Sequence, residues 1–89
     1  EQRKDEEYEN QALQKLDEYD HKHNCNLIET LEVYLNKDSN VGEVAKALNI
    51  HANTLSYRLK RIYEISEIDL KDPNQKMILY LDLKLKKFM

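Results

Sequence analysis

Turn-forming and cross-linking residues are scarce in this chain of 89 residues, which holds one glycine, one proline, one cysteine and no tryptophan. So little glycine and proline argues against a fold built on many tight turns, and the alternating polar and apolar runs of strands are also missing. A single cysteine excludes an internal disulfide and suits a reducing, cytoplasmic environment. No apolar run approaches the roughly 18 residues of a membrane span, so no membrane partner is expected.

Leucine, lysine and glutamate, which favour helices, are abundant instead. The sequence therefore predicts an all-α fold, a small bundle of about five helices. Its length suffices for one modest core and lies near the size at which a partner often adds stability.

Charge is unevenly distributed along the chain, whose formal net charge is −3. Residues 1–20 hold eight acidic and three basic side chains, which leaves eleven basic and nine acidic ones for residues 21–89. Because the local field decides whether phosphate is attracted, the acidic total does not exclude a nucleic-acid partner.

Residues 40–62 predict two short helices joined by a tight turn, the second of them basic. Small Ala45 falls where two crossing helices need close approach. Asn49 falls at the turn, where asparagine is the commonest substitute for glycine at positive φ. An apolar lining follows helical and turn spacings at Val44, Leu48, Ile50, Leu55, Leu59 and Ile62. This pattern is typical of a helix-turn-helix.

The second helix of the pair, about residues 52–63, is phased by taking Leu55 as a core position and advancing about 100° per residue. Leu59 and Ile62 then share the core face. The outward positions are Asn53, Tyr57, Lys60 and Arg61, with Thr54, Ser56 and Arg58 on the flanks. Amide, hydroxyl and cationic groups suit contacts to phosphates and base edges, so we predict that these seven residues bind double-stranded DNA in the major groove. The alternative is an ordinary solvated helix face.

Capping patterns predict where the other helices begin. Asn26 with Glu29, and Asn40 with Glu43, resemble capping boxes. Asp72 followed by a proline and, two residues later, a glutamine predicts the start of the last helix. This helix carries too many apolar residues for one narrow stripe, so some of them are expected to contact the first helix or a second subunit: Met77, Ile78, Leu79, Leu81, Leu83, Leu85 and Phe88.

The N-terminal segment, residues 1–24, is predicted to hold an acidic helix over residues 4–20, which either packs as an accessory or connects to a further domain. Its apolar stripe is Tyr8, Ala12, Leu16 and Tyr19, with Leu13 beside it. Residues 25–89 are predicted to form the helix-turn-helix domain itself.

Other residues that could carry chemistry favour structural roles. His21, His23 and Cys25 lack the second half of a zinc site, so a polar loop with a half-buried cysteine is preferred and no metal is expected. His51 could cap the second helix or donate to a phosphate, and the cap is favoured. Neither a nucleophile with a base nor a phosphate-binding glycine loop is present, so neither enzymatic activity nor a cofactor is expected. Most tyrosines fall on apolar stripes, which leaves Tyr57 as the one credible DNA contact among them.

A further set of residues carries a family resemblance: the run 27–35, Asn40-Val41, Ala45, Leu48, Ile50-His51, Asn53-Thr54-Leu55, Tyr57-Arg58-Leu59, Arg61-Ile62 and Asp69-Leu-Lys-Asp-Pro73. Over about residues 13–88 the chain resembles the C-terminal DNA-binding domain of PucR/CdaR-type bacterial transcription regulators, and its helix-turn-helix is similar to the Fis type. The resemblance implies an all-helical output domain with an upstream sensory region that controls catabolic genes.

Two positions depart from the family pattern. Ala52 stands where arginine is common, which removes one possible DNA contact. Glu67 stands where glycine is common at the end of the second helix, which casts doubt on a tight left-handed stop there.

Two hypotheses remain at this stage. The first is sequence-specific DNA binding by the output domain of a regulator, acting as a homodimer because one such helix covers few base pairs. The last helix, between Met77 and Phe88, is one candidate interface, and the first helix, through Tyr8, Leu13 and Leu16, is another. A region upstream in a longer regulator is a further candidate source of the dimer affinity. The alternative is a helical protein-interaction or dimerisation module that does not bind DNA.

Overall fold

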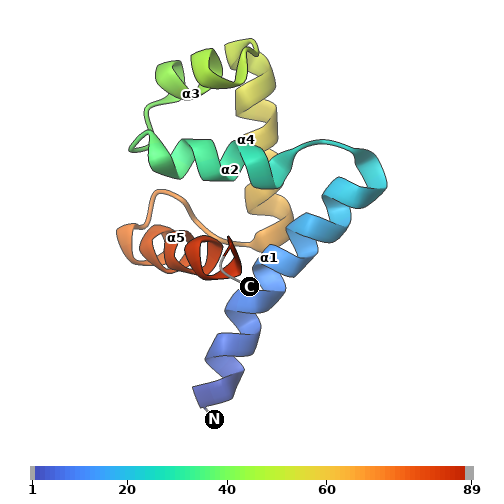
Figure 1. Cartoon of the computed structure of the whole chain (residues 1–89), viewed down its shortest axis with the longest axis vertical. Coiled ribbons are helices and arrows are strands. Elements are labelled where there is room, and N and C mark those ends of the chain that lie inside the picture. Colours follow the sequence, from blue (N-terminus) through green and yellow to red (C-terminus); the bar gives the residue numbers. More distant parts are fainter. Residues whose placement is uncertain (1, 88–89) are drawn as a thin grey trace.

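Five helices make up the chain in the computed structural model, which describes the backbone of residues 2–87 and the side chains of residues 12–85 (Figure 1). They are α1 (Gln2–His23), α2 (Leu27–Asn36), α3 (Val41–Leu48), α4 (Ala52–Ser66) and α5 (Pro73–Lys87). No strand occurs among residues 2–87. The predicted all-α bundle is confirmed, with a first helix longer at both ends than expected. The side chains of Tyr8 and Phe88, two of the predicted apolar positions, lie outside the described residues.

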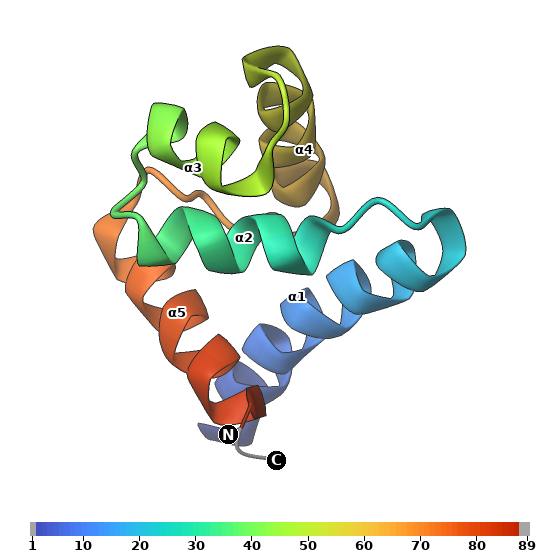
Figure 2. The same ribbon diagram turned by 45° about the horizontal axis from the view of Figure 1, so that its top comes forward.

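The helices enclose one core around α2, which lies between α3 and α4 on one side and α1 and α5 on the other (Figure 2). The buried cluster draws side chains from four helices and the α4–α5 loop: Ala12, Leu13, Leu16, Leu27, Leu31, Leu35, Ile62, Ile68, Leu79 and Leu83. Tyr19, which was predicted to lie on the apolar stripe of the first helix, packs against the edge of this cluster, and so does Tyr34. Because α1 supplies three members, residues 12–16 are packed in the same core as the helix-turn-helix.

Two of the three predicted capping patterns are present. The Asn40 side chain accepts a hydrogen bond from the backbone N–H of Glu43 at 3.1 Å, so it caps α3. Asp72 Oδ1 accepts one from the N–H of Asn74 at 2.9 Å, and Pro73 is the first residue of α5. Each cap satisfies an N–H group that has no partner inside its helix.

The predicted capping box at the start of α2 is wrong. Asn26 lies in the left-handed region, with φ 58°, and its side chain makes no capping hydrogen bond. The Asp20 carboxylate takes this place instead, accepting hydrogen bonds from the N–H groups of Leu27 at 2.7 Å and Ile28 at 2.9 Å. The left-handed residues Asn24 and Asn26 reverse the chain, so the end of α1 meets the positive end of α2.

A left-handed stop ends α4 even though Glu67 replaces the usual glycine. Glu67 has φ 61°, and its N–H donates to the Tyr63 carbonyl at 2.7 Å. The Ser66 hydroxyl, which is buried, donates to the Ile62 carbonyl at 2.6 Å and accepts from the N–H of Ile68 at 3.1 Å. Burial of Ile68 and these bonds hold the turn, so the doubt raised by the missing glycine is resolved in favour of the stop.

Candidate DNA-binding surface

The turn between α3 and α4 has the geometry that the sequence predicted. Asn49 is left-handed, with φ 57° and ψ 48°, and the N–H of Ile50 donates to the Ala45 carbonyl at 3.0 Å. His51 then caps α4, because its Nδ1 accepts a hydrogen bond from the N–H of Asn53 at 3.0 Å. With the cap favoured by the sequence now confirmed, both ends of the turn are fixed by local hydrogen bonds.

The orientation of α4 also agrees with the predicted phase. Leu55 and Ile62 are fully buried and Leu59 is half-buried. The exposed residues of the helix include five of the seven predicted contacts: Asn53, Thr54, Ser56, Tyr57 and Lys60. The beginning of α4 and all of α3 project away from α1 and α5 (Figure 2), so this end of the molecule is open to a ligand.

The sixth predicted contact, Arg58, is half-buried and faces α2. Its Nη1 donates a hydrogen bond to Thr30 Oγ1 at 3.1 Å. Thr30 is fully buried, and its hydroxyl donates to the Asn26 carbonyl at 2.8 Å. The helical phase placed Arg58 on a flank of the predicted DNA-binding face, and its observed partner is a hydroxyl inside the fold.

The seventh, Arg61, lies against α1 rather than opposite the core. Its Nε and Nη2 donate to Tyr19 Oη at 3.2 and 2.8 Å, its Nη1 donates to Glu64 Oε1 at 2.9 Å, and the guanidinium carbon is 4.8 Å from the centre of the Tyr19 ring. The Tyr19 and Glu64 hydrogen bonds raise the pKa of Arg61 above its ordinary value. Helical phase alone gave the wrong environment, because it does not include α1 packed beside α4.

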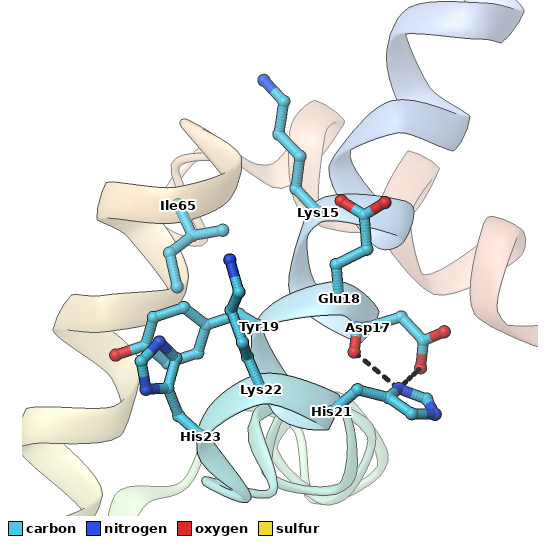
Figure 3. A pocket seen from close by; sticks show the side chains of 8 residues that line it. All are labelled: Lys15, Asp17, Glu18, Tyr19, His21, Lys22, His23 and Ile65. Atoms are coloured by element: carbon cyan, nitrogen blue, oxygen red, sulfur yellow. Dashed lines mark hydrogen bonds and ion pairs between the residues drawn. The ribbon is translucent and has the colours of Figure 1, made fainter.

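The same surface of α1 forms one wall of an open depression of about 820 Å³ that also includes Ile65 of α4 (Figure 3). Tyr19 and His23 lie with their ring centres 4.4 Å apart, and His21 Nδ1 hydrogen-bonds to the Asp17 carbonyl at 2.9 Å. Two lysines, Lys15 and Lys22, and two carboxylates, Asp17 and Glu18, line the depression, so it favours neither an anion nor a cation.

The loop after α1 holds Cys25, which is half-buried as predicted, and its thiol donates to the His23 carbonyl at 3.6 Å. In the described part of the chain, no group of three or more histidine, cysteine, aspartate or glutamate side chains is arranged to hold a metal ion. None of the described helices is both long and apolar enough to cross a bilayer.

Three residues with structural roles near this surface were missed by sequence reasoning. Asp20 caps α2, the Thr30 hydroxyl accepts a hydrogen bond from Arg58, and the Tyr19 hydroxyl accepts hydrogen bonds from Arg61. Each partner lies between 7 and 42 positions away along the chain, so no local pattern identifies it. Tyr63, a fourth omission, is exposed one turn beyond Lys60 on α4 and extends the outward face.

Helix α3 crosses α4 and is joined to it by a left-handed turn, and α4 is capped at its start and exposed on its outward face. This arrangement defines a helix-turn-helix domain, a class that binds DNA. Residues 27–85 match the PucR C-terminal helix-turn-helix domain, and the chain belongs to this family. It is the DNA-binding output domain of a transcription regulator, and its family is one of DNA-binding domains rather than of enzymes.

Three Bacillus subtilis proteins illustrate the relationship. The DNA-binding transcriptional activator AdeR is 57% identical over 77 residues, which cover 86% of this chain and 18% of AdeR. The proline-responsive transcriptional activator PutR is 44% identical, covering 91% of this chain and 20% of PutR. The purine catabolism regulatory protein is 38% identical, covering 90% and 15%. The chain thus spans about a fifth or less of these relatives' length. No solved structure matches it significantly.

Proposed function

We propose that the chain binds double-stranded DNA by placing the outward face of α4 in the major groove. The observation that carries this proposal is the open face formed by Asn53, Tyr57 and Lys60, with no acidic residue between His51 and Tyr63. The Asn53 amide is suited to base edges, where asparagine pairs with adenine, and the Lys60 ammonium is suited to a phosphate. Thr54 and Ser56 offer hydroxyls to the backbone beside them.

The two arginines take a different place in this proposal. Arg58 and Arg61 are engaged with Thr30 and Tyr19, so they hold α4 against α2 and α1. We propose that they orient the DNA-binding helix. Any contact that they make to phosphate would use the guanidinium N–H groups that do not donate to Thr30, Tyr19 or Glu64. The cation on which binding chiefly depends is then Lys60.

The wider function follows from the family and its named members. AdeR and PutR are transcriptional activators, and a third relative is named for purine catabolism. We propose that this chain likewise serves a cytoplasmic regulator of catabolic genes, acts as a homodimer and responds to a sensory region upstream in a longer protein. A catalytic role is not part of this proposal.

The test is a salt titration of DNA binding. The purified chain is titrated onto a duplex from the region upstream of its own gene, between about 50 and 200 mM salt. Because one neutralised phosphate contributes about −0.9 to the slope of log affinity against log salt, Lys60→Gln is expected to flatten the slope by about one unit. Lys71→Gln, at another exposed lysine in the loop before α5, is the matched control and is expected to leave the slope unchanged.

An affinity that does not respond to Lys60→Gln would reject the proposed face. No binding to any duplex at low salt would favour the alternative function, a helical protein-interaction module.

A further inference from the structure

Helix α5 is apolar on two opposite faces. Leu79 and Leu83 are buried in the core, while Met77, Ile78, Leu81 and Leu85 are between 38% and 62% exposed. At about 100° per residue these four fall within an arc of about 100° on the side of the helix opposite Leu79 and Leu83. We call these four residues the outer stripe.

An outer stripe of this kind is unusual for a helix that packs one face on a core, because the other face is then normally polar. Four of the seven large exposed apolar side chains among the described residues belong to it. The other three are Val41, Tyr57 and Tyr63, on α3 and α4. A contiguous exposed apolar patch typically marks an interaction surface.

The stripe of α1, the other interface that the sequence allowed, is already used. Leu13 and Leu16 are buried in the core of the molecule itself. Of the two helices that the sequence offered as interfaces, α5 is therefore the one whose described apolar side chains remain exposed.

We propose that the outer stripe of α5 is the surface on which two copies of this chain pair, with their α5 helices parallel about a two-fold axis. The role of this dimer in DNA binding rests on the proposed function, whereas the observations that support the dimer itself do not involve DNA. In angle around the helix, Lys84 falls just outside the edge of the stripe marked by Met77, and Asp82 falls just outside the edge marked by Ile78. Asp82 and Lys84 are two residues apart along the helix, so both charges lie at nearly the same height.

Charge at these edges selects the parallel arrangement. A two-fold axis along α5 brings the Asp82 edge of one copy against the Lys84 edge of the other, so opposite charges meet on both sides. An antiparallel pair would bring like edges together. The Asp82 carboxylate, one of whose oxygens is buried without a hydrogen-bond partner in the described part of the chain, gains a cation nearby in the parallel pair.

The position of α5 in the molecule fits the same axis. Its first turn lies near the α2–α3 turn, where Lys76 Nζ donates to Ser39 Oγ at 3.0 Å, and the helix then runs away from α3 (Figure 2). A two-fold axis along α5 therefore leaves α3 and the start of α4 of both copies at the same end of the dimer. Two outward α4 faces presented together are what a duplex with two half-sites requires.

The interface offered by four side chains of one helix is small. It falls in the size range of weak, transient complexes, so the isolated chain should pair at high micromolar concentration rather than at nanomolar concentration. Sedimentation equilibrium from micromolar to millimolar chain, without DNA, measures this directly. The wild-type chain is expected to convert from monomer to dimer across that range.

Substitution at Leu81 identifies the surface. Leu81→Glu and Leu81→Lys are each expected to weaken the dimer by about 100-fold, because a two-fold axis makes each substitution count twice. Mixing the two variants is expected to restore a dimer, since Glu then faces Lys. Val41→Glu, a charge placed on an exposed apolar residue of α3, is the matched control and should pair like the wild type.

Restoration by mixing also shows that the variants are folded, and thermal melting by circular dichroism checks each alone. A wild-type chain that stays monomeric to millimolar concentration overturns the proposal, as does a Leu81→Glu chain that pairs like the wild type or a mixture that stays monomeric. Affinity for a duplex with one half-site is measured separately and is expected to be equal for wild type and Leu81→Glu. Absence of that affinity in both the wild type and Leu81→Glu would refute the proposed DNA binding without contradicting the proposed dimer.

Discussion

Neighbouring cations on α4 have different surroundings, and these separate their roles. Lys60 is exposed, whereas the Arg61 side chain is 31% exposed and joins Tyr19 of α1 to Glu64 of its own helix. An exposed ammonium is available to a phosphate at no structural cost. A guanidinium with three hydrogen bonds inside the fold can leave them only by exposing what they satisfied.

Tyr19→Phe tests the role of Arg61. The substitution keeps the ring under the guanidinium and removes the acceptor of two N–H groups. It is expected to lower the free energy of unfolding by about 1 kcal/mol, which is the usual contribution of a charged hydrogen bond that is partly exposed to solvent. Urea denaturation measures it, and Tyr57→Phe on the exposed face is the control with no expected change. Equal stability of Tyr19→Phe and the wild type would show that the contact contributes nothing.

Asp82 gives the fold a pH dependence of unusual sign. Burial raises the pKa of its carboxyl above the ordinary value of 3.8, so the folded state holds this proton more tightly than the unfolded one. The charged form is thus penalised at neutral pH, and the penalty disappears as the pH falls through the raised pKa towards 3.8.

Asp82→Asn is therefore expected to melt at a higher temperature than the wild type at neutral pH, and this difference should shrink as the pH is lowered. Thermal melts at dilute concentration, below the range proposed for pairing, measure the two proteins side by side. A difference that stays constant or grows on acidification would contradict the assigned cause.

At the scale of single elements, α4 depends on its first residues. The Nδ1 atom of His51 occupies the place usually taken by an oxygen of serine, aspartate or asparagine, and it satisfies the N–H of Asn53. The same turn fixes the direction in which α4 leaves α3.

His51→Ala is expected to lower the free energy of unfolding by about 1 kcal/mol, because the N–H of Asn53 loses its partner. His51→Asn restores an acceptor at a preferred capping residue and should stay near the wild-type value. Chemical denaturation of the three proteins gives the comparison, and an alanine variant as stable as the wild type would mean that water replaces the cap without loss.

The two faces of α4 should respond oppositely to truncation. Leu55→Ala removes a fully buried side chain and is expected to cost about 2–5 kcal/mol of stability. Asn53→Ala changes an exposed side chain and should alter stability by less than about 0.5 kcal/mol while reducing the preference for specific over random duplex. Unfolding by Asn53→Ala together with tolerance of Leu55→Ala would refute the orientation of α4.

At the scale of the whole molecule, α1 contributes to the same hydrophobic core against which α4 packs. Ala12, Leu13 and Leu16 are at most 4% exposed, and Asp20 and Tyr19 hold α2 and α4 through hydrogen bonds. The predicted division at residue 24 therefore falls across a shared core.

A chain shortened to residues 25–89 is expected to lose cooperative folding. Two buried leucines alone contribute about 3–6 kcal/mol, against a total stability of about 5–15 kcal/mol for a small domain. Thermal melting by circular dichroism would show a gradual loss of helix rather than a sigmoidal transition. A sharp transition near that of the full chain would establish residues 25–89 as a unit by themselves.

Apart from the start of α2, where the capping box predicted at Asn26 is absent, the sequence by itself determined the main features that depend on residues within about four positions of one another. These are the number and order of the helices, the left-handed turn at Asn49, the caps at Asn40, His51 and Asp72, and the phase of α4 about Leu55. Helical periodicity and capping are local interactions, and local patterns therefore specify them.

Tertiary structure alone decided which polar groups became internal and which apolar groups stayed outside. The cap of α2 by Asp20, the hydrogen bond of Arg58 to Thr30 and the engagement of Arg61 by Tyr19 join residues 7, 28 and 42 positions apart. The helical periodicity of α5 identifies two apolar faces but does not show which of them is buried. Only the packing of α1 and α2 against Leu79 and Leu83 leaves the other face exposed, because a helix can bury in one core only the side that its neighbours reach.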